Sequence, residues 1–329
     1  MNTVLGKLGA VGAIGTIGTM DALDTIQIVL VVLVSILIAN YLFLKWSMRA
    51  QRTTELDEGF ANPEGPDGTT VVLGNEVLYD EFYAQIYDKI VQGGQRTSAE
   101  IGFTVAWAKS FRPEVETFQV LDVGSGTGHA VHEFVQAGVG KVVGLDASEA
   151  MVAVARKQYP KRDFRVGEVE VIGQFAAGEF NLLTLYYFTY YYLRDPVMMF
   201  KNAFMWLQPG GCLVIHLVNR EKFDPILEAA SPFVAFSVQK YAKERITRSR
   251  VTFDKFDYTA EFNHEGSKGE FREEFIFKSG KTRRQVHHLR IPTMEQVVGA
   301  AEANGFAYKQ FIDLTSIGYE YQYLFCFTR

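Results

Sequence analysis

The sequence has only two cysteines, Cys212 and Cys326, and both lie inside apolar runs. We therefore expect buried, reduced thiols, with neither a disulfide framework nor a zinc site. The chain also lacks an excess of positive charge, because its formal net charge is -5. It has no overall basic field to attract duplex nucleic acid, so nucleic acid is not an expected partner. Hydrophobic residues make up 48% of the 329 residues, which favours a packed globular protein over disorder.

Charge is absent from the stretch IQIVLVVLVSILIANYLFL, residues 26–44. As a helix it would extend roughly 30 Å, about the thickness of a hydrocarbon core, so we predict a transmembrane helix over residues 25–46. Lys45, Arg49 and Arg52 follow the stretch, which by the positive-inside rule places the rest of the chain in the cytosol. These residues predict a single-pass membrane protein with its folded domain on the cytosolic side.

The segments on either side of this helix have unusual compositions. Glycine recurs at every third position from Gly6 to Gly18, but proline is absent there, so a collagen helix is not expected over residues 1–24. Residues 47–73 are rich in Thr, Glu, Asp, Gly and Pro, which predicts a linker. The rest of the chain, residues 74–329, is predicted to be the folded domain.

Apolar strand-like segments alternate with amphipathic helical segments along much of this domain. Continuous apolar strands that alternate with helices are typical of a parallel sheet covered on both faces. Capping boxes begin two of the helices, at Thr97 with Glu100 and at Thr293 with Gln296. The sequence therefore predicts an α/β fold with a doubly wound, mostly parallel, seven-stranded sheet. The predicted strands cover residues 118–123, 141–145, 163–166, 180–187, 211–218, 306–312 and 321–328, and the predicted helices include residues 76–91, 97–109, 128–137, 148–157 and 196–207.

Three glycines, Gly124, Gly126 and Gly128, stand between the first strand and its helix. Without Cβ atoms the backbone can turn with positive φ and approach a ligand closely. A nicotinamide site would have the spacing G-x-G-x-x-G, which requires glycine where His129 stands. Asp146 closes the next strand and could accept hydrogen bonds from both ribose hydroxyls of either cofactor class. The glycine spacing, and not Asp146, therefore disfavours a nicotinamide cofactor.

Four segments occur in order along the domain: VLDVGSGTG, VVGLDASEAMVAVAR, FNLLTLYYFTYYYLRDP and WLQPGGCLVIHLV. They resemble the successive motifs of class I S-adenosylmethionine-dependent methyltransferases, and the resemblance extends over about residues 78–329. It implies a Rossmann-like domain that binds S-adenosyl-L-methionine. The last two predicted strands are similar to the pair, one of them antiparallel, that ends the sheet in this family.

The resemblance also implies roles for individual residues. Asp122 would bind the ammonium of the methionine part, and Asp146 would bind the ribose. Met151 would pack on the adenine, and Glu168 would lie near the adenine amine, where the family commonly has Asp. Leu185 and Tyr186 would flank the transferred methyl group. The implied cofactor residues are Asp122, Gly124, Ser125, Gly126, Gly128, Asp146, Ala147, Met151, Glu168 and Leu185.

An insertion over residues 220–291 is larger than a simple crossover. Its partly alternating segments predict three antiparallel strands, over residues 253–262, 270–277 and 282–291, that form a cap over the cofactor. With Tyr83 and Tyr87 of the first helix, this cap is expected to enclose the acceptor. The adjacent His287 and His288 would point to opposite faces of a strand, so no shared metal is expected.

Methyl transfer is an in-line displacement, so alignment in a dry pocket can supply much of the catalysis. A general base is needed only if the acceptor must lose a proton. The candidates near the expected pocket are His129, His216, Tyr186, Tyr187 and Tyr190, and for each the alternative is a packed or hydrogen-bonded structural role. A basic run, Lys240, Lys243, Arg245, Arg248 and Arg250, is either a solvated helix face or a site for an anionic acceptor or lipid headgroup.

Together these observations predict S-adenosylmethionine-dependent methyl transfer to a small-molecule or lipid acceptor at a membrane surface. Two alternatives stay open: a non-catalytic membrane scaffold that retains the fold, and an NAD(P)-dependent oxidoreductase. Residues 216–226, HLVNREKFDPI, resemble methyltransferase-like proteins of large DNA viruses of algae. A virion membrane is therefore the alternative location.

Overall fold

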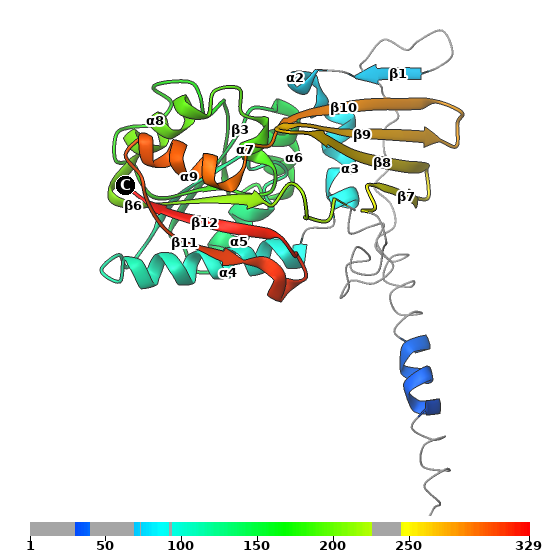
Figure 1. Cartoon of the computed structure of the whole chain (residues 1–329), viewed down its shortest axis with the longest axis horizontal. Coiled ribbons are helices and arrows are strands. Elements are labelled where there is room, and N and C mark those ends of the chain that lie inside the picture. The colour runs from blue at the N-terminus through cyan, green and yellow to red at the C-terminus, as the bar shows by residue number, and fades with distance from the viewer. Residues whose placement is uncertain (1–29, 40–68, 73, 92–93, 226–244) are drawn as a thin grey trace, which may run out of the picture. The chain divides into compact units, whose positions relative to one another are not determined.

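The computed structural model describes residues 30–39, 69–72, 74–91, 94–225 and 245–329 (Figure 1). The chain divides into two compact units, Met1–Asp57 and Glu58–Arg329. In the first unit, residues 30–39 are helical and their apolar side chains are exposed. All the other elements named below belong to the second unit.

The prediction of a membrane-spanning helix is corrected by the structure. Among the described residues, no helix has both the length and the apolar character needed to cross a bilayer. Residues 30–39 would extend about 15 Å as a helix, roughly half of a hydrocarbon core. This finding contradicts the predicted single-pass location, its cytosolic side and the virion alternative. The rest of the predicted helix, residues 25–29 and 40–46, lies outside the described residues, as do the glycine repeat and residues 47–68 of the predicted linker.

The larger sheet of the described chain has seven strands in the order β11-β12-β6-β5-β2-β3-β4. Neighbouring strands from β4 to β6 are parallel, whereas β12 is antiparallel to both β6 and β11. The predicted doubly wound, mostly parallel sheet is therefore confirmed. Its strands are β2 (Gln119–Val123), β3 (Lys141–Asp146), β4 (Asp163–Val166), β5 (Phe180–Leu185), β6 (Leu207–Val218), β11 (Ala307–Asp313) and β12 (Gln322–Thr328).

Helices cover both faces of this sheet, as Figure 1 shows. On one face α8 (Pro196–Trp206) and α9 (Met294–Ala303) bury apolar side chains against the strands. On the other face α4 (Gly94–Phe111), α5 (His129–Gln136) and α6 (Glu149–Gln158) build a second core. The strands between them are buried on both sides, and all the residues of β5 are buried. Continuous apolar strands are the sequence signature of this arrangement.

The two predicted capping boxes have different outcomes. At α9 the Thr293 hydroxyl accepts the Gln296 amide proton, and the Gln296 side chain accepts from the Thr293 backbone, as predicted. The box predicted at Thr97 is wrong, because α4 begins earlier, at Gly94. Glu100 is instead buried and bonded to the side chain of Arg96, 2.8 Å away. A cap-like pattern inside a helix cannot be told from a real cap when the preceding turn is also helical.

A second sheet forms the cap, in the order β1-β10-β9-β8-β7. We predicted three strands, whereas this sheet has five among the described residues. One additional strand, β1, lies at the end of the predicted linker and pairs in parallel with β10. The other, β7, includes Arg248 and Arg250. These two residues therefore do not lie on a helix face, which was one of the two alternatives for the basic run. The strands are β1 (Thr69–Val72), β7 (Arg248–Thr252), β8 (Phe256–Glu265), β9 (Lys268–Phe277) and β10 (Thr282–Arg290).

Three short or broken elements join the two sheets. The helix predicted over residues 76–91 is divided into α2 (Asn75–Leu78) and α3 (Glu81–Val91). The third element, α7 (Thr189–Tyr192), directly follows β5. Figure 1 shows α2, α3 and α7 where the cap strands meet the larger sheet. This junction lies at the carboxyl ends of β2, β3 and β5, where open α/β sheets bind their ligands.

Candidate active site

The glycine loop between β2 and α5 is held against the end of β3. The amides of Gly124 and Ser125 both donate to the carbonyl oxygen of Leu145, at 2.8 and 3.1 Å. Gly124, Gly126 and Gly128 have φ values of 70°, 53° and 90°. L-residues with a side chain rarely adopt this left-handed region. The loop therefore needs glycine at these positions to make the turn.

The three glycines differ in what surrounds them. A Cβ atom on Gly128 would lie 2.5 Å from the ring of Phe164, and one on Gly124 would lie 2.4 Å from the hydroxyl oxygen of Thr189. A Cβ atom on Gly126 would meet nothing within 4 Å. Gly124 and Gly128 thus allow close packing within the protein, whereas Gly126 borders open space that a ligand can use.

Two carboxyl groups lie at the ends of the adjacent strands. Asp146 accepts hydrogen bonds from the amides of Gly126, at 2.7 Å, and Ser148, at 2.9 Å, and burial raises its pKa. Asp122 is 2% exposed and accepts from the Thr184 hydroxyl at 2.8 Å. Burial, opposed by the hydrogen bond from Thr184 and reinforced by the nearby Asp146, raises the pKa of Asp122 to about 7. A cation beside Asp122 would restore its ionised form.

These observations fit the cofactor residues that the sequence implies. Gly126 leaves space next to Asp146, whose two oxygens each keep capacity for another donor such as a ribose hydroxyl. The Ser125 hydroxyl is buried and has no hydrogen-bond partner among the described residues. A buried carboxyl and an unpaired hydroxyl beside open backbone suit a ligand with an ammonium group and several polar atoms.

Other implied cofactor residues have varied surroundings. Met151 is buried, and its amide donates to the hydroxyl of the N-cap residue Ser148. Ala147, in contrast, is exposed. Leu185 is fully buried in the core between the neighbouring strands. Glu168 is partly exposed, and both of its carboxylate oxygens accept from Nη2 of Arg194 at 2.9 Å. Its implied contact with adenine stays a prediction.

His129 joins the glycine loop to α3. Its Nε2 lies 3.1 Å from Asp88, and its Nδ1 lies 2.8 Å from the Tyr159 hydroxyl. The hydrogen bond to Asp88 raises the pKa of His129. Asp88 also accepts from the Thr127 hydroxyl at 2.6 Å. The ring is thus committed to holding the loop against α3, which favours the structural alternative for His129.

His216 is fully buried in β6. Its Nδ1 lies 2.6 Å from the carbonyl oxygen of Tyr187, so Nδ1 carries the proton and Nε2 faces the guanidinium of Arg96 at 3.1 Å. Burial, with the charge of Arg96, lowers the pKa of His216 to about 3. A ring that stays neutral and fully bonded at physiological pH is a poor general base.

The three candidate tyrosines are all held by packing. Tyr186 donates to the Thr104 hydroxyl at 2.8 Å, and burial raises its pKa well above the usual value. Burial also raises the pKa of Tyr190 to about 12. Tyr187 has a φ of 50°, and the guanidinium of Arg96 lies 4.5 Å from its ring centre. Phenols with raised pKa values stay protonated, so Tyr186 and Tyr190 are unsuited to act as bases.

The sequence analysis missed a buried polar cluster under the cap. Glu273 of β9 and His287 of β10 lie 2.5 Å apart, and both are nearly inaccessible. Tyr192 of α7 contacts His287 at 2.6 Å. His288, in contrast, is exposed, so the two adjacent histidines point to opposite faces as predicted. The available signal was the run Arg283, Gln285, His287, whose polar residues alternate along one face of a strand.

The basic run does not form an open cationic surface among the described residues. Arg248 pairs with Glu261 at 2.7 Å, and Arg250 pairs with Asp257 at 3.5 Å. Arg245 donates to two backbone carbonyl oxygens and stacks on an aromatic ring. Lys240 and Lys243 lie outside the described residues. The hypothesis of a lipid headgroup site therefore gains no support.

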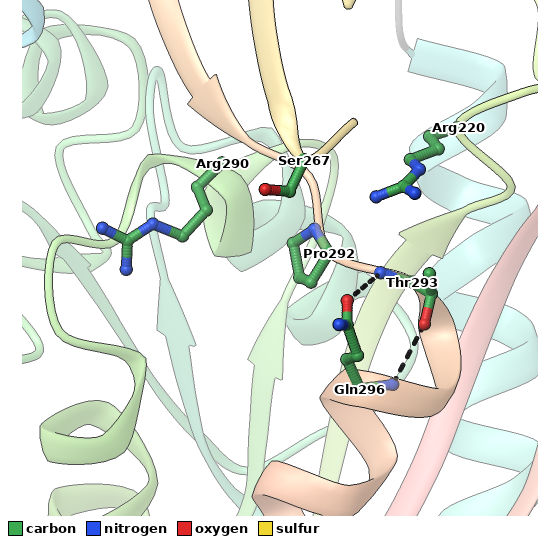
Figure 2. Close-up of a pocket in the computed structure, with 6 residues that line it drawn as sticks. All are labelled: Arg220, Ser267, Arg290, Pro292, Thr293 and Gln296. Carbon is green, nitrogen blue, oxygen red and sulfur yellow. Dashed lines mark hydrogen bonds between the residues drawn. The ribbon is translucent and has the colours of Figure 1, made fainter. Parts of the chain in front are cut away.

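A cleft of about 440 Å³ lies at the start of α9, next to the turn between β8 and β9 and the end of β10 (Figure 2). The capping box already uses the amides of Thr293 and Gln296 there. None of the implied cofactor residues lines it. Likewise, within the described ranges no group of three or more His, Cys, Asp or Glu could hold a metal ion. The cleft is lined by Arg220, Ser267, Arg290, Pro292, Thr293 and Gln296.

Comparison with known families accounts for the segment that carries the glycine loop. A family model described as "Methyltransferase domain" matches residues 120–211, which include the loop, Asp146 and β5. Residues 120–211 are therefore similar to a methyltransferase domain. The strand order of the larger sheet, with its antiparallel strand β12, is similar to that of class I S-adenosylmethionine-dependent methyltransferases. That architecture disfavours the NAD(P)-dependent oxidoreductase.

Curated relatives of the methyltransferase domain share about a third of its residues. The chain is 34% identical over 143 residues to a dTDP-4-amino-2,3,4,6-tetradeoxy-D-glucose N,N-dimethyltransferase of Saccharopolyspora spinosa, which covers 42% of this chain and 55% of that protein. It is 34% identical over 114 residues to a demethylmenaquinone methyltransferase of Chlorobaculum parvum, covering 34% of this chain and 46% of that protein. The chain thus spans about half the length of the curated relatives that it matches.

Solved structures show the same fold over a longer stretch. An S-adenosylmethionine-dependent methyltransferase from Clostridium acetobutylicum superposes with a TM-score of 0.56 at 16% identity, covering 75% of this chain and 97% of that one. CalS10, an amino pentose methyltransferase from Micromonospora echinaspora determined with S-adenosylmethionine bound, gives 0.54 at 21% identity, covering 74% and 97%. At these identities the likeness concerns the fold alone.

Proposed function

We propose that this chain transfers the methyl group of S-adenosylmethionine to a small-molecule acceptor. The observation that carries the proposal is the open space at Gly126, whose amide donates to Asp146, at the end of the strand next to that of the buried Asp122. A scaffold without a ligand would have no need for a bare, left-handed backbone at the ends of two strands that carry these acids. Both named relatives above act on small molecules, an amino sugar nucleotide and a quinone, which supports an acceptor of that class.

Each part of the cofactor has a partner in this arrangement. Asp122 would bind the ammonium, because an adjacent cation stabilises the ionised form of a buried carboxyl. Asp146 would accept hydrogen bonds from the ribose hydroxyls, and Gly126 would let the ligand lie against the main chain. The sulfonium supplies an activated methyl group. The chain's own contribution is to align an acceptor with that group and to exclude water, which can lower the barrier substantially.

Calorimetry on the full chain tests this proposal. We expect S-adenosylmethionine to bind and NADH to show no heat beyond dilution. Binding of NADH alone would instead identify an oxidoreductase, and binding of neither ligand would identify a scaffold.

A single substitution locates the site. Asp146→Ala removes the acceptor for the ribose hydroxyls and for the Gly126 amide, so we expect affinity for S-adenosylmethionine to fall at least about 10-fold, since hydrogen bonds to charged groups contribute roughly 1.5–3 kcal/mol each. Asp163→Ala is the matched control, because Asp163 is an exposed carboxylate on the next strand, paired with Arg165. Wild-type affinity in Asp146→Ala would mean that the cofactor binds elsewhere.

A further inference from the structure

Glu273 is the centre of the buried cluster beneath the cap. It is 2% exposed, and it accepts four hydrogen bonds. Its Oε1 accepts from the hydroxyls of Tyr83, at 3.0 Å, and Tyr258, at 2.5 Å. Its Oε2 accepts from the amide of Gln285 and from Nε2 of His287, both at 2.5 Å. Burial raises the pKa of Glu273, but His287 and the other donors outweigh it and leave the pKa lowered. The carboxylate is therefore ionised.

This carboxylate determines the tautomer of His287. An ionised carboxylate only accepts hydrogen bonds, so Nε2 carries the ring proton and donates it to Glu273. In the neutral ring Nδ1 is then an acceptor, and the group that faces it is the hydroxyl of Tyr192, 2.6 Å away. The three side chains form a directed chain, in which Tyr192 donates to His287 and His287 donates to Glu273. A proton that arrives at Nδ1 would be stabilised by the adjacent negative charge.

The chain of hydrogen bonds ends beside the proposed cofactor site. Tyr192 is the last residue of α7, and Thr189, the first, packs against Gly124 in the glycine loop. The ring of Tyr79 lies 5.7 Å from that of Tyr192. The carbonyl oxygen of Tyr79 accepts the hydroxyl of Ser148, two residues from Asp146, at 2.5 Å. The cluster is thus connected through α7 to the glycine loop, and through Tyr79 and its hydrogen bond from Ser148 to the end of β3 that carries Asp146.

The side chains of the cluster differ in their exposure to solvent, which indicates the side from which a ligand would approach. Tyr79, Tyr87 and Tyr192 are partly exposed, whereas Glu273 and His287 behind them are buried. The three tyrosines pack edge-on against one another or against the histidine, with ring centres 5.7 to 6.3 Å apart. A molecule that enters from the cofactor side would therefore meet phenol rings before the buried pair, and Tyr192 is the one of these three tyrosines that hydrogen-bonds to His287.

The charge of the cluster indicates what that molecule carries. Arg283, which is also buried, is balanced by Asp80 at 2.7 Å. The ion-pair partner that the structure gives Glu273 is His287, at 2.5 Å, and not a lysine or an arginine. Phenol faces next to a buried negative charge suit a cation. The titratable and charged groups that face the pair are Tyr79 before α3, Tyr83 and Tyr87 of α3, Tyr192 of α7, Tyr258 of β8 and Arg283 of β10, with Asp146 beyond the tyrosines.

We propose that the acceptor is an amine that binds at Tyr192 as an ammonium ion, and that His287, supported by Glu273, accepts its proton through the Tyr192 hydroxyl. This inference rests on the proposed function. The ammonium gives a proton to the oxygen of Tyr192 while Tyr192 gives its own proton to Nδ1 of His287. The freed nitrogen lone pair forms a bond to the methyl carbon, and the carbon–sulfur bond breaks with its electron pair going to sulfur. The products are the methylated ammonium and S-adenosylhomocysteine, and the imidazolium returns its proton to solvent through Tyr192 after product release.

The acceptor class is tested with matched pairs of amines and alcohols on the full chain, using methyl-labelled S-adenosylmethionine. The pairs run from cyclohexylamine and cyclohexanol to dTDP-4-amino-2,3,4,6-tetradeoxy-D-glucose and its 4-hydroxy counterpart. We expect label to enter amines and not the matched alcohols. Label in alcohols alone, or in no member although S-adenosylmethionine binds, would overturn the inference. Failure of S-adenosylmethionine to bind would instead refute the proposed function.

The proton path is tested with His287→Asn, Glu273→Gln and Tyr192→Phe on the amine that is methylated fastest. Each should lower kcat at pH 7 by about 100-fold or more, the usual scale of general base catalysis, and change the affinity for S-adenosylmethionine less than 2-fold. The variants should recover by nearly 10-fold per pH unit up to the pKa of the amine, because the free amine then needs no base. A loss that is equal at all pH values would show a structural role and contradict the path.

Two controls are available on the same strands. His288→Asn and Glu270→Gln alter an exposed histidine and a partly exposed carboxylate on the opposite face. Both should retain wild-type kcat and its pH profile. Thermal melting of every variant, with and without S-adenosylmethionine, separates a loss of folding from a loss of proton transfer.

Discussion

Asp122 and Glu273 are both buried carboxyl groups, yet their pKa values move in opposite directions. Glu273 accepts four hydrogen bonds, so its charged form is stabilised despite burial. Asp122 accepts from Thr184 and lies near another acid, so burial dominates and raises its pKa to about 7. The difference is physically sensible, because Asp122 would gain its counter-ion only with a bound ligand, whereas Glu273 has its donors within the fold.

Asp122→Asn should therefore stabilise the ligand-free protein, and only above acidic pH. At low pH the carboxyl is neutral in both the folded and unfolded chain, so the substitution changes little. Between about pH 4 and pH 7 only the unfolded chain ionises, which favours unfolding of the wild type, and the penalty is complete above pH 7. It corresponds to at most about 4 kcal/mol at about 1.4 kcal/mol per pKa unit. Urea unfolding at pH 4 and pH 8 measures it, and an equal effect at both would contradict the assignment.

Some residues of the candidate site could be predicted from the sequence and others could not, for a physical reason. Asp122, the three glycines and Asp146 lie in short motifs whose spacing along the chain is itself informative. Glu273, His287 and Tyr192 come from three elements and meet only because β9 and β10 pair in one register and α7 packs on β10. The alternation of polar residues in β10 could have revealed a polar face, but its partner could not be read from the sequence.

At the scale of elements, the glycine loop combines two requirements that one motif does not distinguish. Gly128 is needed for folding because Phe164 and Ala155 pack against it, whereas Gly126 is needed for the space beside it. Both have positive φ, so an alanine at either position carries a backbone cost of roughly 1–2 kcal/mol. The additional consequences differ because only one of the two added Cβ atoms meets protein.

Gly126→Ala and Gly128→Ala should accordingly separate binding from folding. Gly126→Ala should leave the fold intact with a modest loss of stability and weaken S-adenosylmethionine at least about 10-fold, because its Cβ occupies the ligand space. Gly128→Ala should lower the free energy of unfolding by several kcal/mol, since overpacking typically adds about 1–3 kcal/mol to the backbone cost. Chemical denaturation and calorimetry on both variants measure this. Equal loss of stability in the two would contradict the distinction.

At the scale of the whole molecule, the cofactor should act as a stabilising ligand for the Glu58–Arg329 unit. A ligand that binds only the folded state adds about 2.7 kcal/mol to the free energy of unfolding when its concentration is about 100 times Kd. For a domain of this size that raises Tm by roughly 5 °C or more. Scanning calorimetry with S-adenosylmethionine should show this shift, and Asp146→Ala should lose it. A shift of the same size with NADH would argue for a site without the specificity proposed here.

The largest error of the sequence analysis also belongs to this scale. Hydropathy alone predicted a membrane span near the N-terminus, but no described helix is long and apolar enough to be one. An uncharged run shows only that charged residues are absent from a segment. A membrane span also requires a continuous helix over about 20 residues. The run still differs from the rest of the chain, since its described part exposes apolar side chains within the Met1–Asp57 unit.

The sequence by itself determined the larger sheet, its glycine loop and the two acids at its edge, because each follows from local periodicity and from spacing within one motif. Only the tertiary structure decided how the cap is completed and what it encloses. Strand β1 pairs with β10 across more than 200 residues, and Tyr192, His287 and Glu273 converge from separate elements. Such contacts depend on strand register and packing between distant segments, which short-range patterns in a single sequence do not contain.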